Sequence, residues 1–154
     1  MGRGNSENGL RIKRKLSLRQ SVSRIPVVTA LEPEDCCDVI FVAVRYTQME
    51  TILDALRANP AKNIIFVGNN VHAAETAALL PEKHVMFAFT SAAGHREHDR
   101  VVSADLRKIT IGPLRGAPSA ETLIDRIFEG TKYKVTYEPN MGDYLLCHAA
   151  FVIP

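Results

Sequence analysis

A basic side chain and an amide side chain each follow closely on an apolar run of the sequence. Arg45 comes directly after the apolar run 39–44, and Asn69 comes two residues after the run 63–67. Ligands of open α/β sheets bind beyond the carboxyl ends of the strands, where an arginine can pair with a phosphate through two hydrogen bonds. If both runs are parallel strands, these residues predict a phosphate-binding rim. The alternative is that Arg45 is a solvated strand-end charge and Asn69-Asn70 a plain turn.

Three short apolar runs alternate with two segments of helical periodicity. The apolar runs suit strands that are buried on both faces of a parallel sheet, and the segments between them place apolar residues at helical spacing. A proline follows each helical segment closely and stops it. In chain order the elements are a strand at 39–44, a helix at 47–58, a strand at 63–67, a helix at 72–80 and a strand at 84–89. This alternation predicts right-handed βαβ units and an α/β fold class.

The flanking segments lack this alternation. Turn signals and alternating polarity predict an antiparallel hairpin before it, and a second, late hairpin after it. The expected elements are strands within 10–18 and 21–30, a hairpin pair at 101–102 and 108–112, a helix at 119–128 with Ser119 as its N-cap, a strand at 132–137 and an apolar helix from Asn140 to the end.

Composition, the amino-terminal residues and the cysteines together predict a cytoplasmic protein. It has 154 residues, of which 46% are hydrophobic and 23% charged, as in an ordinary globular domain. No apolar run approaches the roughly 18 residues of a membrane helix, and the first ten residues do not resemble a secretory signal. The three cysteines (Cys36, Cys37 and Cys147) lack zinc-site spacing, and we expect them to be reduced and to serve no catalytic purpose.

Basic residues concentrate at the amino end. Residues 1–24 hold seven Lys or Arg and one Glu, whereas the remainder holds 12 Lys or Arg and 16 Asp or Glu. The segment 11–15 could contact phosphates. The alternative that we favour is a solvated hairpin with Ile12, Leu16 and Leu18 turned inward, since no aromatic residue is present to stack on a base. The sequence therefore argues against a nucleic-acid partner. His95 and His98 lack the spacing of a metal motif, so we expect no metal there.

Four segments resemble, in the same order, the amino-terminal domain of ketopantoate reductases. Residues 8–12 resemble the start of the family's hairpin, and residues 38–48 resemble its strand that ends in a lysine with a glutamine three positions later. Residues 68–71 with Glu75 resemble its Gln-Asn-Gly turn with a downstream glutamate, and residues 109–112 resemble the hairpin that closes the domain. The resemblance covers most of residues 8–154 and implies a Rossmann-type dinucleotide-binding domain.

The resemblance also implies an activity and three cofactor-binding residues. The complete enzymes of this family reduce a 2-keto acid, ketopantoate, with NADPH, a step of pantothenate biosynthesis. Arg45 stands where the family has its cofactor-contacting lysine, Gln48 matches directly, and Asn69 matches the asparagine beside the nicotinamide. The implied cofactor is NADP, and the implied substrate is a small keto acid. We expect a homo-oligomer or a partner chain as the macromolecular partner.

The sequence departs from the family at the residues that matter most for catalysis. No G-x-G-x-x-G motif is present, although such glycines let the backbone approach the pyrophosphate. Leu146 stands at the position of the family's catalytic lysine, and losing a general acid costs about 10²–10⁴ in rate. His148 does not replace it, since two helical residues differ by about 200° in direction, and we expect a packing role for His148.

These departures predict an incomplete and inactive reductase. We expect residues 1–139 to form part of a Rossmann-type domain, with a basic hairpin region at 1–30, and residues 140–154 to begin a helix that leads into an absent helical domain. No catalytic residue is assigned. The competing hypothesis is a non-catalytic protein-interaction module, because a sheet that lacks strands has an open edge that can recruit partners.

Overall fold

The computed structural model describes residues 9–15, 19–116 and 118–152, which form two compact units. Unit 1 comprises Met1–Ala30 and Ser91–Lys108, and unit 2 comprises Leu31–Thr90 and Ile109–Pro154. Two long strands, β5 (His84–Glu97) and β6 (Arg100–Pro113), contribute one part to each unit.

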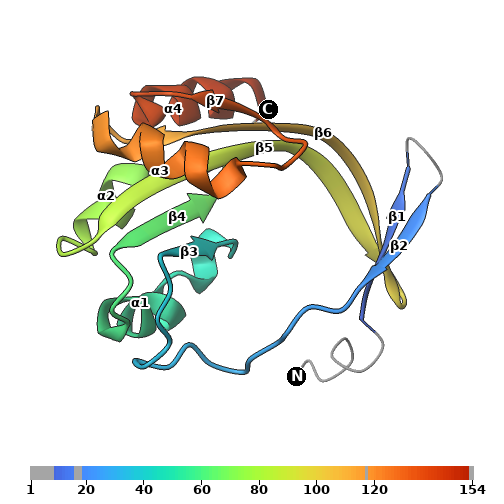
Figure 1. The fold of residues 1–154 in the computed structure, drawn as a ribbon. Coiled ribbons are helices and arrows are strands. Elements are labelled where there is room, and N and C mark those ends of the chain that lie inside the picture. Colours follow the sequence, from blue (N-terminus) through green and yellow to red (C-terminus); the bar gives the residue numbers. More distant parts are fainter. Residues whose placement is uncertain (1–8, 16–18, 117, 153–154) are drawn as a thin grey trace. The chain divides into compact units, whose positions relative to one another are not determined.

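Unit 2 contains the predicted parallel strands. β3 (Val39–Val42) pairs in parallel with β4 (Asn63–Val67), and β4 pairs in parallel with the first half of β5. The order continues through β6, which also pairs with β7 (Lys134–Tyr137) (Figure 1). Neighbouring runs of β-branched and aromatic residues form these strands because both faces of the sheet are covered. The predicted α/β fold with parallel strands is therefore confirmed.

Helices cover both faces of this sheet. One face packs against α1 (Glu50–Ala58), α2 (Ala73–Ala78) and α4 (Met141–Val152), through a core that includes Phe66, Phe87 and Leu145. The other face packs against α3 (Pro118–Phe128), through a core that includes Ile65 and Ile111. Successive residues of β4 enter opposite cores, as the alternation of side chains along a strand requires. No helix within the described residues is both long enough and apolar enough to span a membrane.

Unit 1 contains the predicted amino-terminal hairpin. β1 (Leu10–Arg14) pairs antiparallel with β2 (Gln20–Ser23) and in parallel with β6. The hairpin is confirmed, but β2 ends at Ser23, so the extended pairing expected as far as residue 30 is wrong. Ile12 is half-buried, whereas Leu16 and Leu18 lie outside the described residues.

Several boundaries differ from the sequence prediction: the strands expected at 39–44 and 132–137 and the helices expected at 47–58 and 72–80 are shorter, and three differences are larger. The two short strands expected at 101–102 and 108–112 are parts of one strand, β6, whose antiparallel partner is β5. β5 itself continues through His95, which was expected in a loop. Polar residues stay in these strands because ladder hydrogen bonds involve only the backbone, and strand propensity depends strongly on context. α3 begins at Pro118, so Ser119 lies inside the helix rather than at its cap; proline is well suited to a first helical position.

Candidate functional site

The carboxyl ends of β3 and β4 bring two of the predicted site residues to the same edge of the sheet. Val42 and Phe66 are register partners in the parallel pair. Arg45 and Asn69 each lie three residues beyond these partners, on exposed connections. The rim expected from the apolar runs is thus present, and ligands of α/β sheets bind at such edges.

Gln48 organises the turn after β3. Its side-chain Oε1 accepts a hydrogen bond from the Arg45 backbone N–H at 3.2 Å, and its own backbone N–H donates to the Arg45 carbonyl at 2.9 Å. A short 3-10 helix, η1 (Tyr46–Gln48), leads from there into α1. The Arg45 guanidinium is exposed and joins none of the salt bridges found among the described residues. The turn therefore uses the oxygen of Gln48 and leaves the Arg45 charge available to an anion.

The turn after β4 separates a structural asparagine from an exposed one. Gly68 has a φ of 133°, which an L side chain adopts only with strain, and its N–H donates to the Ala88 carbonyl at 2.9 Å. Asn70 accepts a hydrogen bond from the His72 N–H at 2.9 Å and donates to Thr76 Oγ1 at 3.1 Å. Asn69 is exposed beside it. Asn70 therefore fixes the turn, and Asn69 is the amide presented to solvent.

An aromatic stack joins the two turns. The rings of Tyr46 and His72 lie 4.6 Å apart between centroids and are inclined by 26°. Tyr46 and Asn69 both line a cleft of about 50 Å³ at this edge, whereas Arg45 and Gln48 do not line it. This cleft holds about two water molecules and is smaller than the roughly 300 Å³ of a typical ligand pocket. Sequence reasoning missed Tyr46 and His72, although an aromatic residue directly after a strand-end arginine was a visible signal.

α4 carries the position expected for a catalytic lysine. Leu146 is 55% exposed, and its neighbour Leu145 is fully buried. The His148 ring lies 4.0 Å from that of Phe89 and is parallel to that of Tyr144, within 2°. His148 therefore packs against aromatic residues. Leu146 itself has no proton to donate, so the position expected for the catalytic lysine carries no general acid.

The remaining candidates do not gather into a site. All three cysteines are exposed and free of disulfides. His95 Nε2 lies 3.2 Å from a Glu97 carboxylate oxygen within β5. Across the described ranges, no three His, Cys, Asp or Glu side chains are grouped as metal ligands would be. A larger hollow of about 390 Å³ lies at the other end of the parallel strands, beside Asn63, His84 and Arg115.

The rim fits a dinucleotide only in part. An unpaired guanidinium and an exposed amide suit phosphate and carboxamide groups, which they contact through charge-assisted and neutral hydrogen bonds. Arg45 is a single positive charge, however, whereas a dinucleotide cofactor carries several phosphate charges. The sequence also contains no Gly-rich turn to cradle a pyrophosphate. The described residues therefore supply groups suited to only some parts of a dinucleotide.

Solved structures of known enzymes share this fold. The 2-dehydropantoate 2-reductases of Porphyromonas gingivalis W83 and Methylococcus capsulatus match with TM-scores of 0.77 and 0.74, at 14% and 18% identity. The match covers 94% and 95% of this chain but 52% and 49% of those chains. A dimeric ketopantoate reductase from Staphylococcus aureus matches with a TM-score of 0.66 at 15% identity, over 92% of this chain and 46% of that one.

These structures show that the chain has the fold of about half of each enzyme. No curated protein matches the chain. The family model described as "Ketopantoate reductase PanE/ApbA" matches residues 3–116, which is well over half of the sequence. On that match, and with the Rossmann-type fold that its strands and helices form, the chain belongs to the ketopantoate reductase family.

Proposed function

We propose that this chain forms one part of the NADP-binding domain of a ketopantoate-reductase-like oxidoreductase of the cytoplasm, whose substrate is a small 2-keto acid such as ketopantoate. The observation that carries the proposal is the register of β3 and β4, with Arg45 and Asn69 three residues beyond paired strand residues. Such an edge is where α/β sheets bind nucleotides.

Each of three residues takes a role that its surroundings allow. The Arg45 guanidinium, free of ion pairs among the described residues, pairs with a cofactor phosphate. Gln48 holds the backbone of that turn through the 3.2 Å hydrogen bond at Arg45 N–H and keeps its amide N–H groups for the cofactor. Asn69 presents its amide at the cleft lined by Tyr46.

Taken alone, the 154-residue chain binds NADPH weakly and does not reduce a keto acid. The sequence has no Gly-rich turn, and Leu146 cannot donate a proton to the alkoxide that hydride transfer produces. Activity would need the missing groups from further protein, in a longer chain or a partner chain. The S. aureus relative is described as dimeric, which supports a homo-oligomer for this chain, but a second copy of the same sequence would not supply the missing groups.

Thermal unfolding in the presence of NADPH tests the cofactor site. With a dissociation constant of about 1 mM, about 5 mM NADPH stabilises the chain by about 1 kcal/mol, which raises the unfolding temperature by about 2–4 °C. Arg45→Ala should abolish this rise, and Arg45→Lys should keep most of it. Lys62→Ala is the matched control, because Lys62 is an exposed cation at the amino end of β4. No rise in the wild type, or an equal loss in both alanine variants, would contradict the proposal.

A second candidate function rests on β3. It stands at the end of the strand order and pairs only with β4 among the described strands, and Phe41 on it is 43% exposed. Apolar edge strands recruit further strands. Light scattering distinguishes the two functions: a partner-binding module associates through β3 without NADPH, and Phe41→Lys disrupts that association while leaving NADPH binding intact.

A further inference from the structure

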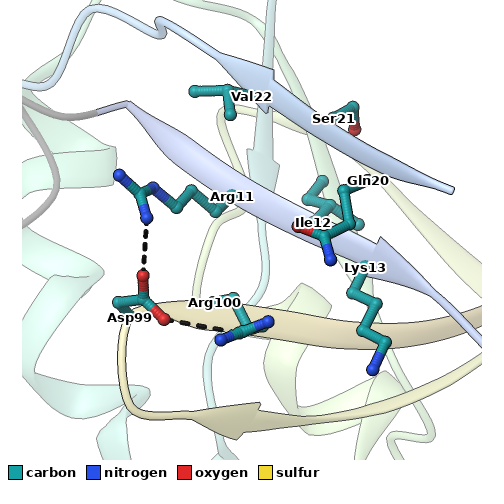
Figure 2. Close-up of a pocket in the computed structure, with 8 residues that line it drawn as sticks. All are labelled: Arg11, Ile12, Lys13, Gln20, Ser21, Val22, Asp99 and Arg100. Atoms are coloured by element: carbon teal, nitrogen blue, oxygen red, sulfur yellow. Dashed lines mark hydrogen bonds and ion pairs between the residues drawn. The ribbon is translucent and has the colours of Figure 1, made fainter.

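Three cationic side chains share one face of the sheet in unit 1. Along β1, Arg11 and Lys13 are two residues apart and so point to the same side. Lys13 is the register partner of Val102 in β6, and Arg100 precedes Val102 by two residues just as Arg11 precedes Lys13. Register partners share a face, so Arg100 lies on this side too (Figure 2).

A single carboxylate holds both arginines in place. Arg11 Nη1 lies 2.7 Å from Asp99 Oδ2, and Arg100 Nε lies 3.3 Å from Asp99 Oδ1 (Figure 2). Lys13 is half-buried and joins no salt bridge among the described residues. Among the residues that line the groove, three cations and one carboxylate leave an excess of two positive charges. Asp99 therefore orders the two guanidiniums without neutralising them.

These three cations border a groove that is large enough for a compact anionic group. A groove of about 150 Å³ is lined by six polar or charged residues and two apolar ones: Arg11, Lys13, Gln20, Ser21, Asp99 and Arg100, with Ile12 and Val22. This volume corresponds to about five water molecules, and it is below the roughly 300 Å³ of a pocket for a whole small molecule. Gln20, the register partner of Lys13, adds a neutral hydrogen-bond donor from β2. The groove suits a compact anionic group rather than a whole nucleotide.

The neighbouring residues decide which anion fits. The carboxylate of Glu97 lies 3.2 Å from His95 and does not line the groove. No Phe, Tyr or Trp occurs in the sequence of residues 1–30 or 91–108. Binding to single-stranded nucleic acid usually needs aromatic rings on which bases stack. The absence of such residues favours an isolated phosphate group over a nucleic-acid strand.

We propose that the groove between β1, β2 and the turn at Asp99 binds the phosphate monoester of a small metabolite, with Arg11, Lys13 and Arg100 as its cationic ligands. A dianionic monoester matches the excess of two positive charges, and guanidinium forks fit phosphate oxygens. This site lies wholly within unit 1 and is independent of the NADP role proposed for Arg45.

Titration with inorganic phosphate and with simple phosphate esters that are not nucleotides tests the site. Inorganic phosphate, phenyl phosphate and dimethyl phosphate are added while backbone amide signals of residues 11–13, 20–22 and 99–100 are followed by two-dimensional NMR. We expect saturable shifts with inorganic and phenyl phosphate at millimolar concentrations and much smaller ones with the monoanionic diester. Lys13→Ala should weaken binding of the dianion about thirtyfold, the effect of one unit charge about 4 Å from a doubly charged group in water.

Two controls separate the outcomes. Arg14→Ala removes an exposed cation from the opposite side of β1, and Arg45→Ala removes the proposed cofactor cation; neither should change phosphate affinity. The proposal fails if phosphate produces no saturable shift, or if Lys13→Ala and Arg14→Ala weaken binding equally. It also fails if a single-stranded oligonucleotide binds far more tightly than phenyl phosphate with a steep salt dependence, since that would make the surface a nucleic-acid site.

Discussion

The side chain of Asn59 ties the connection before β3 to the segment between α1 and β4, and it offers the sharpest test of the fold around these strands. It is 1% exposed, at the end of α1. Its Nδ2 donates to the carbonyls of Glu32 at 3.0 Å and Asp35 at 2.9 Å, and its Oδ1 accepts from the Ala61 N–H at 2.9 Å. Asn59 thus fixes both the approach to β3 and the start of β4.

Replacing Asn59 with alanine should cost about 3 kcal/mol. The Ala61 N–H is buried and loses its partner, which costs about 1–3 kcal/mol. The two carbonyls are part-buried, so water can replace the amide there at a cost of about 0.5–1.5 kcal/mol each. For a chain of this length, about 3 kcal/mol lowers the unfolding temperature by about 6–12 °C.

Urea denaturation followed by circular dichroism measures this loss directly. The matched control is Asn63→Ala, which removes two exposed interactions: the amide donation to the Asp38 carbonyl at 2.9 Å and the contact of Oδ1 with His84 Nδ1 at 3.3 Å. We expect the control to lose less than about 1 kcal/mol, because water replaces the exposed interactions. If the two variants lose equal stability, or if Asn59→Ala loses less than about 1 kcal/mol, the assignment of Asn59 as a buried tie is refuted.

Three further predictions concern α4, β6 and the groove of unit 1. On α4, Leu145→Ala should lower the free energy of unfolding in urea by about 2–5 kcal/mol because Leu145 is fully buried. Leu146→Ala, at a position 55% exposed, should change it by less than about 0.5 kcal/mol, and equal losses would refute the packing of this helix. Gly112→Ala should lower the free energy of unfolding, measured by thermal unfolding, by about 3 kcal/mol or more. A Cβ there would lie 1.8 Å from the backbone carbonyl oxygen of Glu138, which directly follows β7. A stable, normally folded variant would contradict this. Asp99 loses hydration, which alone would raise its pKa, but the nearby Arg100 and Arg11 guanidiniums hold the pKa of that carboxyl below its usual value. Because the folded-state pKa of Asp99 is depressed, the ion pairs stabilise the groove above the unfolded-state pKa and are lost as pH falls through the folded-state pKa. An NMR titration of the Asp99 carboxyl carbon should therefore show a midpoint below about 3.9. A higher midpoint would count against the ion pairs.

Local patterns sufficed to predict the parallel centre of the chain. The apolar run of β4 identifies a strand covered on both faces, and the Asn-Pro pair at 59–60 ends the preceding helix, as the structure confirms. The positions of Arg45 and Asn69 beyond their strands follow from the same runs, because parallel strands end at one edge of a sheet. Their roles toward a cofactor stay predictions.

The tertiary structure alone decided which distant segments meet. Polar residues 91–97 extend β5 because their backbone groups pair with β6, a choice that side-chain polarity does not encode. The Tyr46–His72 stack joins connections from two different strands, and the groove of unit 1 joins Arg11 to Asp99 across 88 positions. Periodicity acts over a few neighbouring residues, whereas these contacts depend on strand register between segments far apart in the chain.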